Sequence, residues 1–143
     1  MGWGVSNFEP SRTKFRKSFK AYIVGNASAG STVEFGDYGL KACTGCRISS
    51  RQIEAARRVA TRFISKRGKL WIRVFPDCPV TAKPAASRMG KGKGNVDHWV
   101  FKLQPGRVVF EVCGISRDEA RLALLKAACK LPAKFRFVEN MSC

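Results

Sequence analysis

Apolar residues recur at helical spacing along residues 49–67, which predicts an amphipathic helix there. Ser49 stands three positions before Gln52, the spacing of a capping box. Gly68 follows and is expected to end the helix. The side chains of the predicted apolar stripe are Ile53, Ala56, Ala60 and Phe63.

A second helix is predicted over residues 117–131. Ser116 and Glu119 again have capping-box spacing, and Pro132 follows the segment because proline cannot continue a helix. The apolar side of this helix is expected to consist of Ala120, Ala123, Leu124, Ala127, Ala128 and Leu131.

Short β-prone runs occupy the segments around the two helices. Residues 32–35 and 38–42, separated by Gly36 and Asp37, predict a hairpin. Residues 69–75 are apolar on both alternating faces, which predicts a strand in the middle of a sheet, ending at Pro76.

Two more strands are predicted at residues 98–103 and 107–112, joined by a turn at residues 104–106. Residues 135–138 are the candidate for a last strand. This order of elements predicts an α+β sandwich, with two helices covering one mixed or antiparallel sheet. Neither a repeat nor a linker divides the chain, so residues 21–143 are expected to form a single domain behind an arm of residues 1–20.

Composition adds a strong positive charge to this picture. The 143 residues include 27 Lys and Arg against 10 Asp and Glu, a net charge of +17. A hydrophobic content of 45% excludes a disordered polycation, and no run of apolar residues is long enough for a transmembrane helix. A polyanionic partner would relieve the self-repulsion, and nucleic acid is favoured over an anionic membrane surface.

The positive charge is concentrated in particular segments. The arm contains five bases and no acid between residues 12 and 20, with phenylalanines interleaved, which is typical of an arm that orders on phosphates. The helix predicted at residues 49–67 carries six bases and a single acid, Glu54, whereas an ordinary surface helix mixes charges. Its bases are Arg51, Arg57, Arg58, Arg62, Lys66 and Arg67.

Glycine and lysine alternate within a loop predicted at residues 83–97. The stretch from Gly90 to Gly94 lacks the spacing of a P-loop or of a dinucleotide-binding turn. Its small residues would let the backbone lie close to phosphate, beside the mobile ammonium groups of Lys91 and Lys93.

Cysteine and histidine supply little recognisable chemistry. Cys43 and Cys46 form a CxxC pair, half of a zinc site, but the other cysteines are single and His98 is the one histidine. No secretory signal is expected at the N-terminus, so we expect reduced thiols, no metal and no cofactor. A zinc- or thiol-dependent protein using Cys43 and Cys46 stays open as an alternative, and a catalytic role of His98 is not expected.

Five stretches of the chain resemble a known family, in its order and at close to its spacing. They are RTKFRK at 12–17, FGxxGLKA at 35–42, RQIEAARR at 51–58, WIRVFPD at 71–77 and RMGKGKGNV at 88–96. Over nearly the whole chain, the sequence is similar to the bacterial and organellar large-subunit ribosomal protein L sixteen family.

The resemblance implies an α/β-hammerhead-like fold and a structural, non-enzymatic role in the large ribosomal subunit. It implies binding to large-subunit rRNA, to the A-site tRNA near the peptidyl transferase centre and to neighbouring ribosomal proteins, without a membrane or a small-molecule substrate. The expected rRNA-binding residues are Arg12, Lys14, Arg16, Lys17, Lys20, Arg47, Arg51, Arg57, Arg58, Arg62 and Arg73. The loop expected near the tRNA consists of Arg88, Met89, Gly90, Lys91, Gly92, Lys93, Gly94 and Asn95.

The chain departs from the family pattern in two places. Residues 18–24 are more apolar and less basic than the usual arm, and residues 44–47 contain one base fewer than the usual turn. Together with six cysteines, these departures favour a mitochondrial ribosome, with the bacterial cytoplasm or a plastid as alternatives. A non-ribosomal RNA-binding protein is the remaining alternative.

Overall fold

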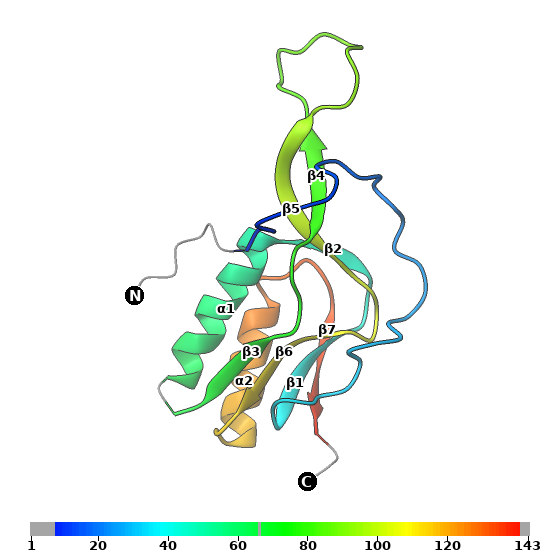
Figure 1. Cartoon of the computed structure of the whole chain (residues 1–143). Helices are drawn as coiled ribbons and strands as arrows, with labels where there is room; N and C mark the ends of the chain where they lie inside the picture. Colours follow the sequence, from blue (N-terminus) through cyan, green and yellow to red (C-terminus); the bar gives the residue numbers. More distant parts are fainter. Residues whose placement is uncertain (1–7, 66, 141–143) are drawn as a thin grey trace.

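The computed structural model describes residues 8–65 and 67–140. Two helices and two antiparallel sheets make up this part of the chain, which confirms the α+β prediction (Figure 1). The larger sheet has the strand order β3-β6-β1-β7, and the smaller has the order β2-β5-β4. The prediction of one sheet was therefore wrong. The strands are β1 (Tyr38–Ala42), β2 (Cys46–Ser49), β3 (Lys69–Ile72), β4 (Cys78–Ala82), β5 (Asn95–Leu103), β6 (Val108–Cys113) and β7 (Phe135–Glu139).

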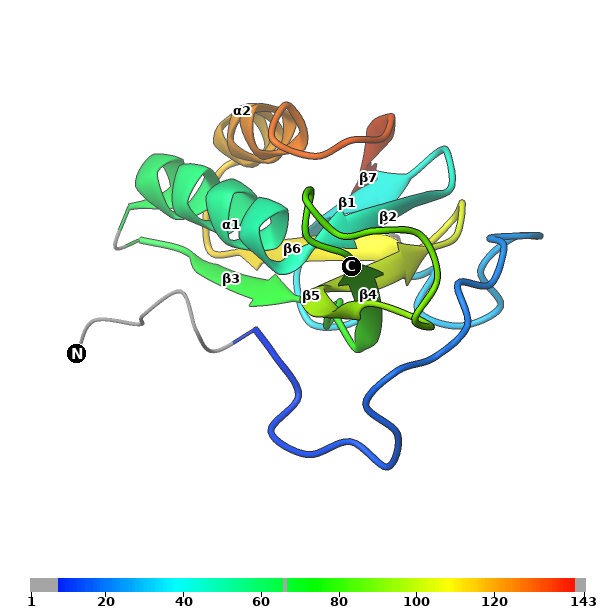
Figure 2. The ribbon, with the colours of Figure 1, turned by 90° about the horizontal axis from the view of Figure 1, so that it is seen from above.

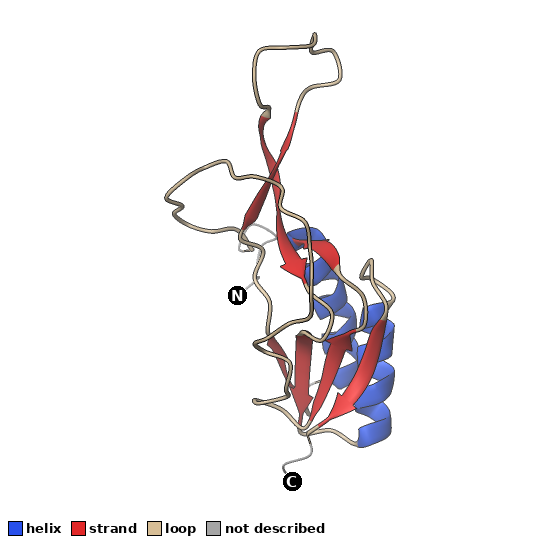
Figure 3. Ribbon diagram, turned by 90° about the vertical axis from the view of Figure 1, so that its right-hand side faces the viewer, coloured by secondary structure: helices blue, strands red, loops and turns tan. Residues whose placement is uncertain are grey.

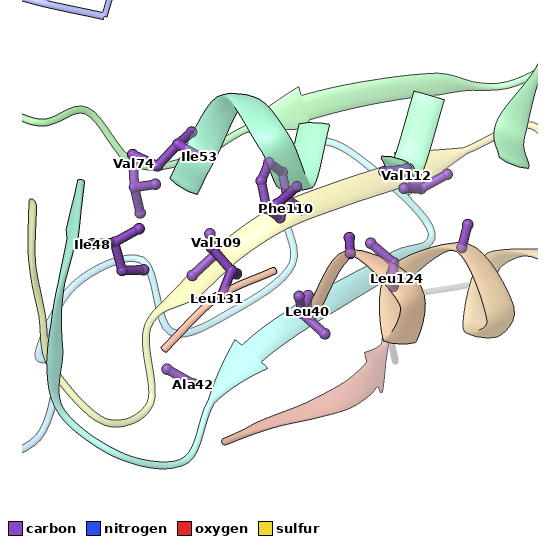
Figure 4. Packing of buried hydrophobic residues seen from close by; sticks show 14 of the residues in the cluster. Leu40, Ala42, Ile48, Ile53, Val74, Val109, Phe110, Val112, Leu124 and Leu131 are labelled. Carbon is purple, nitrogen blue, oxygen red and sulfur yellow. The ribbon is translucent and has the colours of Figure 1, made fainter. Parts of the chain in front are cut away.

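Both helices, α1 (Ser50–Ile64) and α2 (Arg117–Ala128), lie against the same face of the larger sheet (Figure 2). Their apolar stripes meet the inward side chains of β1 and β6, the two central strands of this sheet. Leu40, Phe110 and Leu124 are fully buried where the layers meet (Figure 4). Within the described chain, neither helix is long and apolar enough to cross a bilayer.

Helix α1 begins as predicted but ends earlier. The Ser49 hydroxyl accepts from the Gln52 N–H and the Gln52 side chain accepts from the Ser49 N–H, which confirms the capping box. The helix ends before Ser65, which has a φ of 60°, and not at Gly68. Gly68 instead allows close packing, because a Cβ there would lie 2.8 Å from the carbonyl oxygen of Cys113. The apolar stripe ends with Ile64, four residues after Ala60, and not with the predicted Phe63, since Ile64 is buried and Phe63 is exposed.

The hairpin predicted at residues 32–42 was wrong, because only β1 forms. The backbone N–H groups of Glu34, Phe35 and Gly36 donate to the carboxylate of Glu111, at 3.2, 2.6 and 3.1 Å. These N–H groups are therefore not available for a strand ladder. Residues 34–36 instead cross the sheet as an irregular segment, the strap.

The strand predicted at residues 69–75 is shorter, and it lies at an edge of the sheet. The strap covers its outer side, since the Phe35 and Trp71 rings stack with centroids 6.5 Å apart. Strand β3 is therefore apolar on both faces because the strap packs on one of them, and not because β3 is a central strand. Strand β4 was not predicted, and it contains Pro79, which is tolerated because β4 lies at an edge of the smaller sheet.

The turn at residues 104–106 is confirmed, and it leads from the smaller sheet into the larger one. Helix α2 begins at the predicted cap, where the Ser116 hydroxyl accepts from the Glu119 N–H. It ends at Ala128, three residues before the predicted end, and β7 follows as expected. Strands β4 and β5 extend beyond the body of the molecule as a hairpin, with the Gly-Lys loop at its tip (Figure 3).

Candidate nucleic-acid interface

The described part of the arm, residues 8–20, has no helix or strand, and the chain stays irregular up to residue 37. Residues 1–7 of the predicted arm lie outside the described chain. Residues 11–20 are all exposed. In the described chain none of the arm bases forms an ion pair with a carboxylate, so their ammonium and guanidinium groups are available to phosphates. These bases are Arg12, Lys14, Arg16, Lys17 and Lys20.

Hydrogen bonds join the arm to the Gly-Lys loop. The ammonium of Lys17 donates to the carbonyl of Lys93 at 3.2 Å, and that of Lys93 donates to the carbonyl of Ser18 at 2.6 Å. The Lys93 ammonium also lies 5.9 Å from the ring centroid of Phe19. Two basic segments that are 76 residues apart in sequence are thereby brought into one surface.

Residues 21–24, which follow the arm, are hydrogen-bonded to the smaller sheet and to the turn at residues 104–106. In both cases a side chain donates to a backbone carbonyl. Arg47 donates to Ala21 at 2.6 Å, and Gln104 donates to Val24 at 3.0 Å. The Nε atom of Arg47 is buried without a hydrogen-bond partner. Arg47, expected to bind rRNA, is therefore half-buried and engaged by the segment that passes over it.

The loop between β4 and β5 extends farthest from the core. Gly90, Lys91 and Gly92 all have positive φ, at 90°, 58° and 74°, so glycines occupy two of three consecutive left-handed positions. The Lys83 ammonium donates to the Gly90 carbonyl at 2.6 Å and draws the loop back on itself. Met89, at 98% exposure, stands at the surface. The predicted loop residues from Arg88 to Lys93 are all exposed. Asn95, the last predicted loop residue, is also exposed and is the first residue of β5.

The bases of α1 fall into two groups. Arg57 donates to Glu54 at 2.7 and 2.8 Å, and Arg58 donates to it at 2.9 Å. The hydrogen bond from Arg57, with that from Arg58, lowers the pKa of the buried Glu54 carboxyl to about 2. Arg51 and Arg62 are exposed and have no carboxylate partner among the described residues. Hence Arg51 and Arg62 are the freer phosphate ligands on this helix.

Arg73 was expected to bind rRNA, but the structure engages it internally. Its guanidinium pairs with the fully buried Glu111 and, at 3.0 Å, with Glu34. It also lies 4.6 Å from the ring centroid of Phe35. With its side chain only 12% exposed, Arg73 holds the strap to the sheet. Glu111, flanked by Phe110 and Val112 in an apolar strand, was the sequence signal for this buried pair.

The CxxC pair of the zinc- or thiol-dependent alternative and the single histidine are exposed or half-buried. Cys43 is exposed, whereas Cys46 is half-buried, and burial raises the pKa of the Cys46 thiol. That direction opposes a reactive thiolate. No group of three His, Cys, Asp or Glu able to hold a metal is found among the residues described. His98 does have an acid beside it, since its Nδ1 lies 2.7 Å from Asp97, but both side chains are surface groups.

A groove between the arm and the β4–β5 hairpin was not predicted from the sequence. It has a cavity volume of about 560 Å³. Aromatic residues from both sides line it, Phe15 from the arm and Trp99 with Phe101 from β5. Aromatic residues alternating along one strand were the available signal, but only the tertiary fold brings the arm against them.

Comparison with known proteins agrees with the sequence motifs. Residues 10–138 match the family described as ribosomal protein L16p/L10e. The chain is also 56% identical over 132 residues to the large ribosomal subunit protein uL16 of Alkalilimnicola ehrlichii (strain ATCC BAA-1101 / DSM 17681 / MLHE-1). That alignment covers 92% of this chain and 96% of the relative. The chain therefore belongs to the ribosomal protein L16p/L10e family.

Proposed function

We propose that this protein is a structural constituent of the large ribosomal subunit and binds large-subunit rRNA. The observation that carries the proposal is its 56% identity, over nearly the whole length of both chains, to a large-subunit protein. The bases of the arm and the loop support it, because they face solvent without carboxylate partners in the described chain. Such bases are suited to sequence-independent phosphate contacts.

The rRNA-binding surface combines two segments, the arm and α1. The arm contributes Arg12, Lys14, Arg16, Lys17 and Lys20, and α1 contributes Arg51 and Arg62, with Arg57 and Arg58 partly neutralised by Glu54. Because these segments lie on different sides of the small core, the domain is suited to a position between several RNA segments. Arg73 instead holds the strap through Glu111, and Arg47 holds the segment after the arm through the Ala21 carbonyl.

The Gly-Lys loop, residues 88–95, is proposed to point toward the A-site tRNA near the peptidyl transferase centre. Its place at the tip of a projecting hairpin supports this role, since a slender extension reaches farther than the domain body (Figure 1). Neighbouring large-subunit proteins are the other partners. No enzymatic activity, small-molecule substrate or membrane contact forms part of the proposal.

The bacterial cytoplasm is the proposed location. The relative reported above is bacterial, and the mitochondrial expectation finds no support in it. The apolar stretch at residues 18–24 and the six cysteines had motivated that expectation, and a plastid was its other alternative.

Sedimentation tests the proposal. The tagged full chain is expressed in a bacterial host, and ribosomal particles are separated on a sucrose gradient at low Mg²⁺. We expect the chain in the large-subunit fraction, with ultraviolet cross-links from the arm and the loop to rRNA. Recovery only in ribosome-free fractions would contradict the proposal; RNA there would favour the non-ribosomal alternative, and stoichiometric zinc would favour the Cys43 and Cys46 alternative.

A further inference from the structure

The groove between the arm and the β4–β5 hairpin shares Lys14 with the phosphate-binding bases discussed above and adds aromatic walls to it. Its volume of about 560 Å³ lies within the range of small-ligand sites in proteins. One wall of the groove comes from arm residues near Phe15, and the other comes from β5 and the start of β4. The arm contacts that hold Lys17 and Lys93 together keep the walls opposed.

Three aromatic rings give the groove its chemical character. Trp99 and Phe101 are two positions apart on β5, so both side chains project from the same face of the strand. Both are half-buried, whereas Phe15, in the opposite wall, is 73% exposed. Flat rings with accessible faces are typical of sites that stack unpaired nucleobases.

Charge distinguishes this groove from one for an apolar peptide. The ammonium of Lys14 lies 5.6 Å from the ring centroid of Phe15, and Lys102 also lines the groove. Asp77 is the single acid among its lining residues. A ring with an ammonium beside it matches a nucleotide, in which a flat base is joined to a phosphate.

We propose that this groove binds an unpaired nucleotide of RNA, with the base against Phe15, Trp99 and Phe101 and a phosphate near Lys14. The proposal rests on the proposed function and adds the class of RNA element that the protein recognises. A paired base is stacked within its helix and does not offer its faces, so a bulged or looped nucleotide is required.

Two RNA hairpins of equal length test the proposal. One contains a single bulged uridine and the other is fully paired, and the full chain is titrated with each at constant salt. The unsubstituted protein is expected to bind the bulged hairpin about tenfold more tightly, within the range known for stacking of one base on an aromatic side chain. F15L should abolish this preference, because leucine retains apolar volume without a ring.

Y22L is the matched control, since Tyr22 follows the arm closely, is 91% exposed and does not line the groove. It should keep the preference for the bulged hairpin. A photoreactive 4-thiouridine at the bulge should cross-link to Phe15, Trp99 or Phe101. Equal binding of both hairpins by the unsubstituted protein, or a cross-link confined to other segments, overturns the groove proposal and leaves rRNA binding standing.

Failure to bind either hairpin at low salt, together with absence from the large subunit, would remove the proposed function itself. If a photoreactive group at position 15 in assembled subunits cross-links only to a neighbouring protein, the groove is a protein-docking site and the nucleotide proposal is wrong. These outcomes separate failure of the groove from failure of the wider function.

Discussion

Lys17 and Lys93 are joined by reciprocal interactions between the arm and the loop. The Lys17 side chain donates to the Lys93 backbone, and the Lys93 side chain donates to the backbone of Ser18, the residue after Lys17. Both ammonium groups are exposed and could exchange these carbonyls for phosphate oxygens on binding RNA. The pair therefore positions the arm before RNA is present, which reduces the ordering entropy that binding must overcome.

Loss of the Lys93 ammonium should loosen the arm without affecting the core. In K93M, we expect chymotrypsin to cleave after Phe19 about two- to tenfold faster, the range that corresponds to one hydrogen bond of about 0.5–1.5 kcal/mol. The free energy of unfolding should change by less than about 0.5 kcal/mol. K91M is the control, because no hydrogen bond joins the Lys91 side chain to the described part of the arm. Equal cleavage rates in both variants would contradict the proposed link.

Removing the charge of Glu111 should strongly destabilise the fold. Its buried carboxylate accepts from three backbone N–H groups of the strap and pairs with Arg73. E111Q leaves Arg73 without its buried partner, and we expect a loss of about 3–5 kcal/mol in urea unfolding. E34Q removes the half-exposed partner of the same guanidinium and should cost less than about 1 kcal/mol. Similar losses in both variants would show that burial of Glu111 does not matter.

Glu54 predicts a stability change at acid pH. Its pKa is about 2 in the folded chain against 4.5 for an ordinary glutamate, because Arg57 and Arg58 stabilise the ionised form. The stabilisation is therefore complete above pH 4.5 and is lost as the pH falls toward 2. At pH 7 the free energy of unfolding of the unsubstituted protein should exceed that of E54Q by roughly 2–3 kcal/mol. The two free energies should converge as the pH approaches the folded pKa of Glu54.

Urea unfolding at a series of pH values measures the Glu54 difference. E119Q is a suitable control, since Glu119 is 47% exposed and pairs with Arg67 only at 3.5 Å. Its effect should stay within about 1 kcal/mol throughout. A gap between the protein and E54Q that does not change with pH would contradict the assignment to the Glu54 carboxylate.

The two groups of arginines on α1 should separate binding from stability. R51Q/R62Q removes two exposed charges, so affinity for an rRNA fragment should fall and the log–log salt slope should decrease by about two. Thermal stability should stay unchanged, because neither side chain pairs with a carboxylate in the described chain. R57Q instead removes a partner of Glu54 and should lower stability. Loss of stability in R51Q/R62Q would show that these residues also support the fold.

The sequence by itself determined the α+β class, both helix starts and the family. These features depend on local signals, such as the capping box of Ser49 and Gln52 and the apolar stripes, or on motifs such as RMGKGKGNV. The bases of the arm and the loop were also visible, because a run of bases without acids does not depend on the fold.

Only the tertiary structure decided which of these bases are free. Arg73 and Arg47 are as basic in sequence as Lys14, but the buried carboxylate of Glu111 engages Arg73 and the Ala21 carbonyl holds Arg47. The strap replaced a predicted strand because Glu111, about 75 residues away, accepts its backbone N–H groups. Burial and long-range hydrogen bonding depend on which segments meet in space, and local sequence does not contain that information.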